Sequence, residues 1–137
     1  MITLARTAYD AVVSHARDGG DEEVCGVLAG TYGDQESRVE TAHRARNVAE
    51  RPTVRYRIDP EEQLAILESV ADAGRTAVGF YHSHPAGPPG PSETDAARAA
   101  WPDRSYVVCA LDGQPFVGSW RWRDDGERFE AETVAVE

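Results

Sequence analysis

The sequence predicts a mixed α/β protein in which a curved sheet is flanked by two main helices and a shorter third. Apolar residues recur at helical spacing in two long segments, and short apolar runs of strand character lie between them. Glycine and proline clusters separate the two kinds of segment. The 137 residues suffice for one core and are too few for two, so we expect one domain over residues 1–137.

The first elements follow from the spacing of apolar residues and from a glycine pair. Apolar residues recur at helical spacing after Ala5, which predicts an amphipathic helix, and Gly19-Gly20 ends the pattern. The apolar run that begins at Val24 is short and rich in branched residues, so it predicts a buried strand. The elements expected here are a strand over residues 2–4, a helix over 5–17, a strand over 24–30 and its hairpin partner over 37–43.

The middle of the chain contains the clearest helix start. Asp59 is a typical capping residue, Pro60 suits the first helical position, and the next two residues are acidic, as the first turn prefers. Gly74 ends this helix, and apolar and basic residues that alternate over 54–58 predict a half-exposed strand before it. Residues 76–82 predict another strand after it. The expected buried stripe of the helix consists of Leu64, Leu67, Val70 and Ala71.

The C-terminal half is divided by prolines and by an acidic turn. The prolines of residues 85–91 are incompatible with a helix or a central strand, and they predict a stiff loop. A pattern that suits a final antiparallel pair surrounds the turn at 124–126. The elements expected here are a short helix over residues 92–100 and strands over 105–111, 115–122 and 128–136.

The charge balance argues against nucleic acid as a partner. The formal net charge is -10, and a surface of that sign repels phosphate backbones. All fourteen basic residues are arginine. An acidic excess without lysine indicates adaptation to high intracellular salt, as in a halophilic archaeon, although a GC-rich genome that favours arginine codons explains the same composition.

Membrane and secretion signals are missing from the sequence. No run of eighteen apolar residues exists, so we expect no membrane span and no membrane partner. The first residues lack the basic and long apolar regions of a signal peptide, which favours a soluble cytoplasmic protein. Cys25 and Cys109 are then expected to be buried thiols, although neighbouring strands could also hold them as a disulfide. They lack the spacing of a four-cysteine zinc site.

The most informative segment runs from residue 79 to residue 95. His82 and His84 lie two positions apart near the end of a predicted strand, so their imidazoles project from the same face. Asp95 lies on the first turn of the helix after the proline loop, and a loop that reverses direction would return its carboxylate to the histidines. Two histidines and a carboxylate suit a catalytic zinc site, whose fourth position stays open for water. We therefore expect one zinc ion per chain.

Two further residues complete a hydrolytic site. Glu23 precedes a predicted strand and is the candidate general base, which takes a proton from zinc-bound water and passes it to the leaving nitrogen. Ser92 is the candidate hydrogen-bond donor to the oxyanion. Each has a structural alternative. Ser92 with Asp95 also fits a helix-capping box, and Glu23 adjoins Glu22 in an acidic cluster of a kind that is usually solvated surface.

These residues resemble the signature of the JAMM/MPN+ zinc metalloproteases in type and in spacing. The His-x-His-Pro motif at residues 82–85 is followed by Ser92 and Asp95 at the family's spacing. Residues 23–30 are similar to the family's Glu-x-x-Gly-x-Leu-x-Gly strand, and residues 47–60 are similar to its prokaryotic members. The resemblance implies a single MPN domain of the cytidine-deaminase-like class. It also implies the zinc ligands, base and oxyanion residue proposed above.

The resemblance, which spans about residues 2–122, implies a function as well. Members hydrolyse the isopeptide bond between the C-terminal glycine of a ubiquitin-like protein and a lysine, and similar archaeal members remove small modifiers that also act as sulfur carriers. We therefore expect a zinc-dependent isopeptidase whose partners are ubiquitin-like modifiers, sulfur carriers and their conjugates.

Two other functions and the oligomeric state stay open. Bacterial relatives trim the tail of a sulfur carrier, which implies cleavage of a linear peptide as an alternative. A non-catalytic scaffold domain of the same fold belongs to a different class, but such domains usually lack the histidines or the aspartate.

Overall fold

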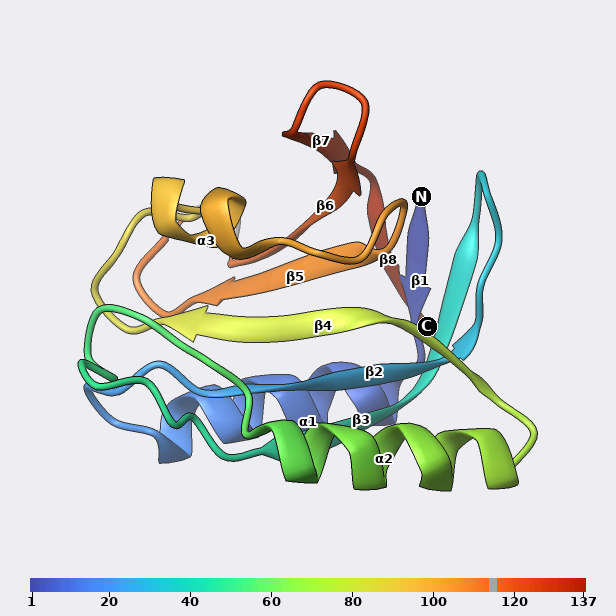
Figure 1. The fold of residues 1–137 in the computed structure, drawn as a ribbon, viewed down its shortest axis with the longest axis horizontal. Coiled ribbons are helices and arrows are strands. Elements are labelled where there is room, and N and C mark those ends of the chain that lie inside the picture. The colour runs from blue at the N-terminus through green and yellow to red at the C-terminus, as the bar shows by residue number, and fades with distance from the viewer. Residues whose placement is uncertain (114–115) are drawn as a thin grey trace.

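A mixed β-sheet of eight strands organises the described part of the chain (Figure 1), which in this computed structural model comprises residues 1–113 and 116–137. The strands are β1 (Ile2–Leu4), β2 (Cys25–Thr31), β3 (Ser37–Ala45), β4 (Thr76–His84), β5 (Ser105–Ala110), β6 (Val117–Arg123), β7 (Arg128–Glu132) and β8 (Val134–Val136). The helices within these residues are α1 (Arg6–Asp18), α2 (Pro60–Asp72) and α3 (Glu93–Arg98). The predicted fold class is confirmed.

The sheet is curved because its two edge strands follow one another in the chain. The spatial order is β7-β6-β5-β4-β2-β3-β1-β8, and only Thr133 separates β7 from β8. A segment that pairs antiparallel with β6 therefore passes directly into a strand that pairs in parallel with β1. The prediction of one strand over residues 128–136 is wrong in this respect. The segment forms two strands separated by Thr133, one at each edge of the sheet.

A buried polar network joins the three strands at the β7 edge of the sheet. The Glu132 carboxylate accepts hydrogen bonds from the Ser105 hydroxyl at 2.6 Å and the Ser119 hydroxyl at 2.8 Å. It also pairs with Arg121 Nε at 3.0 Å, and only 2% of Arg121 is exposed. Burial opposes ionisation of Glu132, but these hydrogen bonds outweigh it and lower its pKa. The network therefore joins β5, β6 and β7 through an ion pair whose partners are both satisfied.

Two cores lie on the two faces of the sheet. The core under α1 is largely aliphatic, and the core under α2 and α3 is largely aromatic. The aliphatic core includes Val12, Leu28, Val78, Tyr81, Val107 and Cys109. The aromatic core includes Phe80, Tyr106 and Trp122, with Leu67, Trp101 and Phe129 packed against them. β4 contributes Val78 and Tyr81 to the aliphatic core and Phe80 to the aromatic core, so it takes part in both. Its pairing with β2 shifts register next to Val78, which explains why Val78 and Phe80, two residues apart, face opposite sides.

The segment before α2 is an irregular loop, so the strand predicted over residues 54–58 is wrong. Its pairing in the described residues is limited to an isolated bridge between Asn47 and Ile58. The Asn47 side chain holds this loop in place of a neighbouring strand. Its amide group donates to the Arg55 carbonyl and accepts the Arg57 N–H. Alternation of apolar and basic residues arises here because the arginines face solvent, not because the backbone is pleated.

The buried stripe of α2 is also displaced from the predicted one. Val70 is buried as expected, but Leu64 is 59% exposed and Ala71 is exposed. The helix packs against the sheet through Ile66, Leu67 and Val70. At about 100° per residue, Leu64 and Ala71, which are seven residues apart, lie on the same side of the helix, roughly a quarter turn from Val70 at the centre of that stripe.

Smaller differences concern the ends of elements. β4 runs two residues beyond the predicted strand, to His84, and α3 ends at Arg98 instead of residue 100. The predicted start of a strand at residue 115 lies outside the described residues, and β6 begins at Val117.

Cys25 and Cys109 are free, buried thiols. They lie on β2 and β5, which are separated by β4. Cys109 belongs to the aliphatic core, whereas Cys25 lies two residues before Val27 of the aromatic core and shares its face, so the thiols face opposite sides of the sheet. This geometry is incompatible with the disulfide alternative.

No helix in the described ranges combines the length and the apolar character that crossing a bilayer requires.

Candidate metal centre

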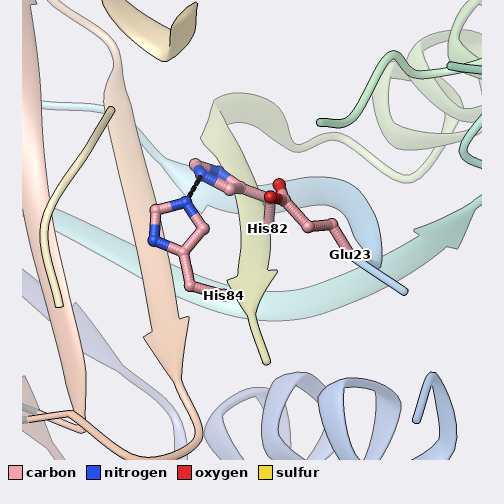
Figure 2. Close-up of side chains that lie close together, drawn as sticks. All are labelled: Glu23, His82 and His84. Atoms are coloured by element: carbon pink, nitrogen blue, oxygen red, sulfur yellow. Dashed lines mark hydrogen bonds between the residues drawn. The ribbon is translucent and has the colours of Figure 1, made fainter. Parts of the chain in front are cut away.

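β4 carries both candidate histidine ligands to one end of the sheet. The strand pairs with β2 on one side and β5 on the other, and alternation places His82 and His84 on the same face as Phe80. Both histidines are buried, with exposed fractions of 1% and 4%. Their Nε2 atoms lie 3.2 Å apart, so the two imidazoles converge as the sequence predicts (Figure 2).

Asp95 approaches the histidines from the first turn of α3. Ser92 caps this helix: its hydroxyl accepts the Asp95 N–H at 3.0 Å, and its own N–H donates to Asp95 Oδ2 at 2.8 Å. The same Oδ2 lies 3.0 Å from His82 Nε2 and 3.4 Å from His84 Nε2. The capping box and the approach to the histidines therefore coexist, and the cap fixes the direction of the carboxylate.

The three converging atoms fit a zinc ion. Ligand bonds of about 2.0–2.1 Å in a tetrahedral site separate neighbouring ligand atoms by roughly 3.3 Å. The separations among the His82, His84 and Asp95 atoms are 3.2, 3.0 and 3.4 Å. Two imidazoles and one carboxylate are also a donor set that catalytic zinc sites use.

Neighbouring groups orient both imidazoles. His84 Nδ1 lies 2.7 Å from the Pro88 carbonyl oxygen. A carbonyl only accepts, so Nδ1 carries the proton and Nε2 presents its lone pair to the centre. The ring of His82 stacks on that of Tyr56, with centroids 4.3 Å apart and planes inclined by 22°. The proline loop and Tyr56 thus hold the two histidines from outside the centre.

Glu23 lies across from the two histidines. Ligand atoms of Glu23, His82 and His84 all lie within 4.8 Å of one another (Figure 2). Glu23 is 6% exposed, and its Oε1 is buried without a hydrogen-bond partner in the described residues. Glu22 is exposed, so of the two neighbouring acids only Glu23 faces the centre. A carboxylate oxygen held in this way can accept a proton from water beside the metal ligands.

Hydrogen bonds position the Glu23 backbone from two sides. Its N–H donates to the Pro52 carbonyl at 2.7 Å, and its carbonyl accepts from Asn47 Nδ2 at 2.9 Å. The following residue, Val24, donates its N–H to the Ser83 hydroxyl at 2.9 Å. Because Ser83 lies between the two histidines of β4, this bond ties the candidate base to the strand that carries the ligands.

Burial changes the proton affinities at the centre. It raises the pKa of Glu23 to about 7, against the opposing effect of His84 and with the support of Asp95. Burial also disfavours the Asp95 carboxylate, but hydrogen bonds from His82 and His84 outweigh it and hold that pKa well below its usual range. Burial lowers the pKa of His82. At neutral pH the centre therefore combines an ionised Asp95, a neutral His82 and a Glu23 poised to exchange a proton.

A cavity of about 370 Å³ opens onto the centre. Glu23, His84 and Ser92 line it together with the proline loop. The Ser92 oxygen accepts the Asp95 N–H, and within the described residues its hydroxyl hydrogen has no acceptor. That hydrogen is therefore free to be donated to a group bound in the cavity.

Three positioning residues are not evident from the sequence. Asn47 and Tyr56 lie in a segment that sequence reasoning marks only by its family resemblance. An asparagine between elements often organises a loop through its side chain, and that signal was available for Asn47. Ser83 lies between His82 and His84, but nothing in the sequence indicates its bond to Val24.

The chain is similar to known proteins over most of its length. The family described as prokaryotic homologs of the JAB domain matches residues 5–123. A protein named desampylase from Haloferax volcanii is 48% identical over 99% of this chain and 96% of its own length. The CysO-cysteine peptidase of Mycobacterium tuberculosis is 42% identical over 79% of this chain and 72% of its own length.

Solved structures share the fold over nearly the whole chain. A solution structure of a protein from Desulfitobacterium hafniense is 29% identical, with a TM-score of 0.87, and the match covers 100% of this chain and 93% of that one. A JAB1/MPN domain protein from Archaeoglobus fulgidus has a TM-score of 0.61 over 98% of this chain and 97% of its own. At 15% identity, the second likeness concerns the fold alone.

Proposed function

The chain belongs to the family of prokaryotic homologs of the JAB domain, and from this premise we propose that it is a zinc-dependent isopeptidase. Its substrate is a conjugate in which the C-terminal glycine of a ubiquitin-like modifier is joined to a lysine side chain. The relative named desampylase, 48% identical over 99% of the chain, supports this reaction class. The observation that carries the proposal is the unpartnered, buried Glu23 Oε1 beside the converging atoms of His82 and His84.

Three residues would hold the metal. His82 and His84 contribute Nε2 atoms, and Asp95 contributes its carboxylate from the capped turn of α3. When bound there, zinc supplies Lewis acidity that polarises the scissile carbonyl and acidifies water. The Pro88 carbonyl keeps the proton of His84 on Nδ1, away from the ligand atom.

Glu23 moves the proton that hydrolysis requires. Its Oε1 takes a proton from the attacking water as oxygen bonds to the glycine carbonyl carbon. It then returns that proton to the lysine nitrogen as the carbon–nitrogen bond breaks, which leaves a glycine carboxyl group and a free amine. A pKa raised to about 7 by burial suits both transfers at neutral pH. Ser92 donates its free hydroxyl hydrogen to the developing oxyanion.

Replacing Glu23 with glutamine tests the assignment of the base. Glu23→Gln keeps the shape of the side chain but cannot accept the proton, so we expect cleavage of a modifier conjugate to fall about 10²–10⁴-fold. Zinc content, measured by atomic absorption, should stay at one ion per chain. Glu22→Gln is the matched control, because that neighbour is exposed, and it should cleave at the wild-type rate. Wild-type cleavage by Glu23→Gln would refute this role.

A second candidate function is the trimming of a linear peptide from a sulfur-carrier protein. The match to the CysO-cysteine peptidase, 42% identical over 79% of this chain, favours it. The same centre would hydrolyse both bonds, so the two candidate functions are distinguished by which substrate is cleaved faster. Faster cleavage of a carrier with a C-terminal extension than of a lysine-branched conjugate would favour the second candidate over the first.

A further inference from the structure

A separate cavity of about 230 Å³ lies beside the metal centre on the same face of the sheet. Phe80, Trp101 and Tyr106 contribute aromatic rings to it, and we call it the aromatic cavity. Tyr56 also lines it, and the Tyr56 ring stacks on His82. The aromatic cavity is thus separated from a candidate metal ligand by the thickness of one ring.

Two arginines line the aromatic cavity, and two more line a hollow that shares residues with it. Arg57 and Arg98 line it, and both also line an adjoining hollow of about 220 Å³ with Arg51 and Arg55. We call these four residues the arginine rim. All four are exposed, and none of their guanidinium groups forms an ion pair within residues 1–113 and 116–137. Glu50 is the acidic residue that lines the adjoining hollow.

This concentration of free positive charge is unusual for the chain. The net charge is -10, and six other arginines are neutralised in ion pairs with carboxylates. An enzyme of that charge repels acidic proteins over most of its surface. The arginine rim is therefore a place where an acidic partner meets an attractive potential, and guanidinium forks are well suited to carboxylates.

The arginine rim is tied closely to the candidate metal centre. Asn47 accepts the Arg57 N–H at 2.9 Å and donates both to the Arg55 carbonyl and to the Glu23 carbonyl. Arg98 ends α3, the helix whose first turn carries Asp95. A partner bound at the rim is consequently held in a fixed position relative to the candidate base and ligands.

We propose, on the basis of the isopeptidase function above, that the arginine rim and the aromatic cavity dock the body of the modifier. The occupant is an acidic ubiquitin-like protein that presents carboxylates to the rim and one apolar side chain to the cavity. The cavity is smaller than the roughly 300 Å³ and more of a typical small-molecule pocket, so a single anchoring side chain suits it better than a cofactor. The rim supplies affinity for the modifier, and the metal centre supplies the reaction.

Reversing the charge of the rim tests this docking. In Arg57→Glu/Arg98→Glu, KM for a conjugate of an acidic modifier should rise about tenfold or more, with kcat unchanged, because the lost pairs act in binding alone. Arg75→Glu is the matched control: Arg75 is exposed, forms no ion pair in the described residues and precedes the opposite end of β4. It should change KM less than twofold. The neutral Arg57→Gln/Arg98→Gln variant should give an intermediate KM.

A second substrate separates docking from catalysis. A fluorogenic peptide that contains only the modifier's last residues, joined through glycine to lysine, does not reach the rim. All variants should cleave it at the wild-type rate, which also shows that they are folded. If the wild-type protein cleaves neither substrate, the proposed function fails. If it cleaves both and the rim variants keep the wild-type KM for the conjugate, docking at the rim fails instead.

The choice of partner is tested by competition. Free modifier should inhibit conjugate cleavage, and a modifier whose surface carboxylates are replaced by amides should inhibit at least several-fold more weakly. Inhibition by duplex DNA but not by free modifier would assign the rim to nucleic acid and overturn the proposal. Equal inhibition by the acidic and the amidated modifier would overturn it as well.

Discussion

The two faces of β4 differ in how completely their polar groups are satisfied. Toward α1, the Tyr81 hydroxyl lies 2.7 Å from His15 Nδ1, and the Ser83 hydroxyl accepts a backbone N–H. Toward α2 and α3, Glu23 Oε1 and His82 Nδ1 are buried without hydrogen-bond partners, and no other buried side-chain nitrogen or oxygen of the described residues shares that condition. Unpartnered buried atoms cost stability, so their confinement to one face marks the face that serves a purpose other than folding.

The same contrast separates two histidines whose pKa values are both lowered by burial. Burial lowers the pKa of His15 to about 4 and also lowers that of His82. His15 has its partner in Tyr81, whereas His82 converges with His84 and Asp95 on one point. Burial therefore does not distinguish a functional histidine from a structural one, but convergence of ligand atoms does.

Removing a metal ligand should produce the largest difference between the two faces of β4. His82→Ala or Asp95→Ala leaves two groups for the metal, so we expect loss of bound zinc and a fall in conjugate cleavage of at least about a thousandfold. Tyr81→Phe, its neighbour on the other face, should keep both zinc and activity. Metal analysis and single-turnover cleavage of the same preparations check this. A His82→Ala protein that retains one zinc per chain would contradict the ligand assignment.

Truncating a side chain in the aliphatic core should lower stability but leave zinc binding and activity unchanged. Leu28 is fully buried under α1, and Leu28→Ala should lower the free energy of unfolding by about 2–5 kcal/mol in urea titration. Zinc content and cleavage per folded molecule should stay at wild-type values, because His82 and His84 lie on the opposite face of β4 from this core. Leu64→Ala, which truncates a side chain that is 59% exposed, should cost less than about 0.5 kcal/mol. Lost zinc in folded Leu28→Ala would show that the two faces are not separable.

The smallest expected effect is a pH dependence carried by His15. Its pKa is lowered to about 4, by burial first and by Arg44 second, with Asp18 opposing. Since the pKa is lower in the folded state than in the unfolded one, the neutral form contributes full stability above about pH 6.5 and loses it as the pH falls toward 4.

A variant isolates this contribution from the other groups that titrate in the same range. Because solvent reaches the half-buried ring, we expect a loss of only about 1 kcal/mol between pH 7 and pH 4.5. The difference in unfolding free energy between wild type and His15→Gln should change by that amount across the interval. A difference that is constant with pH would show that His15 does not titrate as its surroundings imply.

The sequence predicts the candidate site better than its surroundings because the site depends on local spacing. Residues two apart on a strand share a face, and a capped helix start fixes the direction of Asp95, so both features follow from positions alone. The approach of Glu23 to the histidines depends on the pairing of β2 with β4, which opposes Cys25 and His82. Only the family resemblance anticipates that approach, because the sequences of β2 and β4 do not by themselves determine the register in which the two strands pair.

The wrong predictions concern segments whose conformation is decided by distant partners. Residues 54–58 alternate like a strand but are held by the side chain of Asn47. Leu64 follows the helical period of α2 yet faces solvent, since the orientation of that helix on the sheet is set by Ile66 and Leu67. The division of the C-terminal segment at Thr133 depends on both edges of the sheet at once.

The direct passage from β7 to β8 couples the two edges of the sheet mechanically. In an open sheet the outermost strands can fray independently, and their amide protons exchange early. Here, detaching β8 from β1 also pulls on β7, which the Glu132 network fastens to β5 and β6. Amides of these opposite edges should therefore exchange with solvent as one cooperative unit, so that a short C-terminal segment links the fraying of one edge to that of the other.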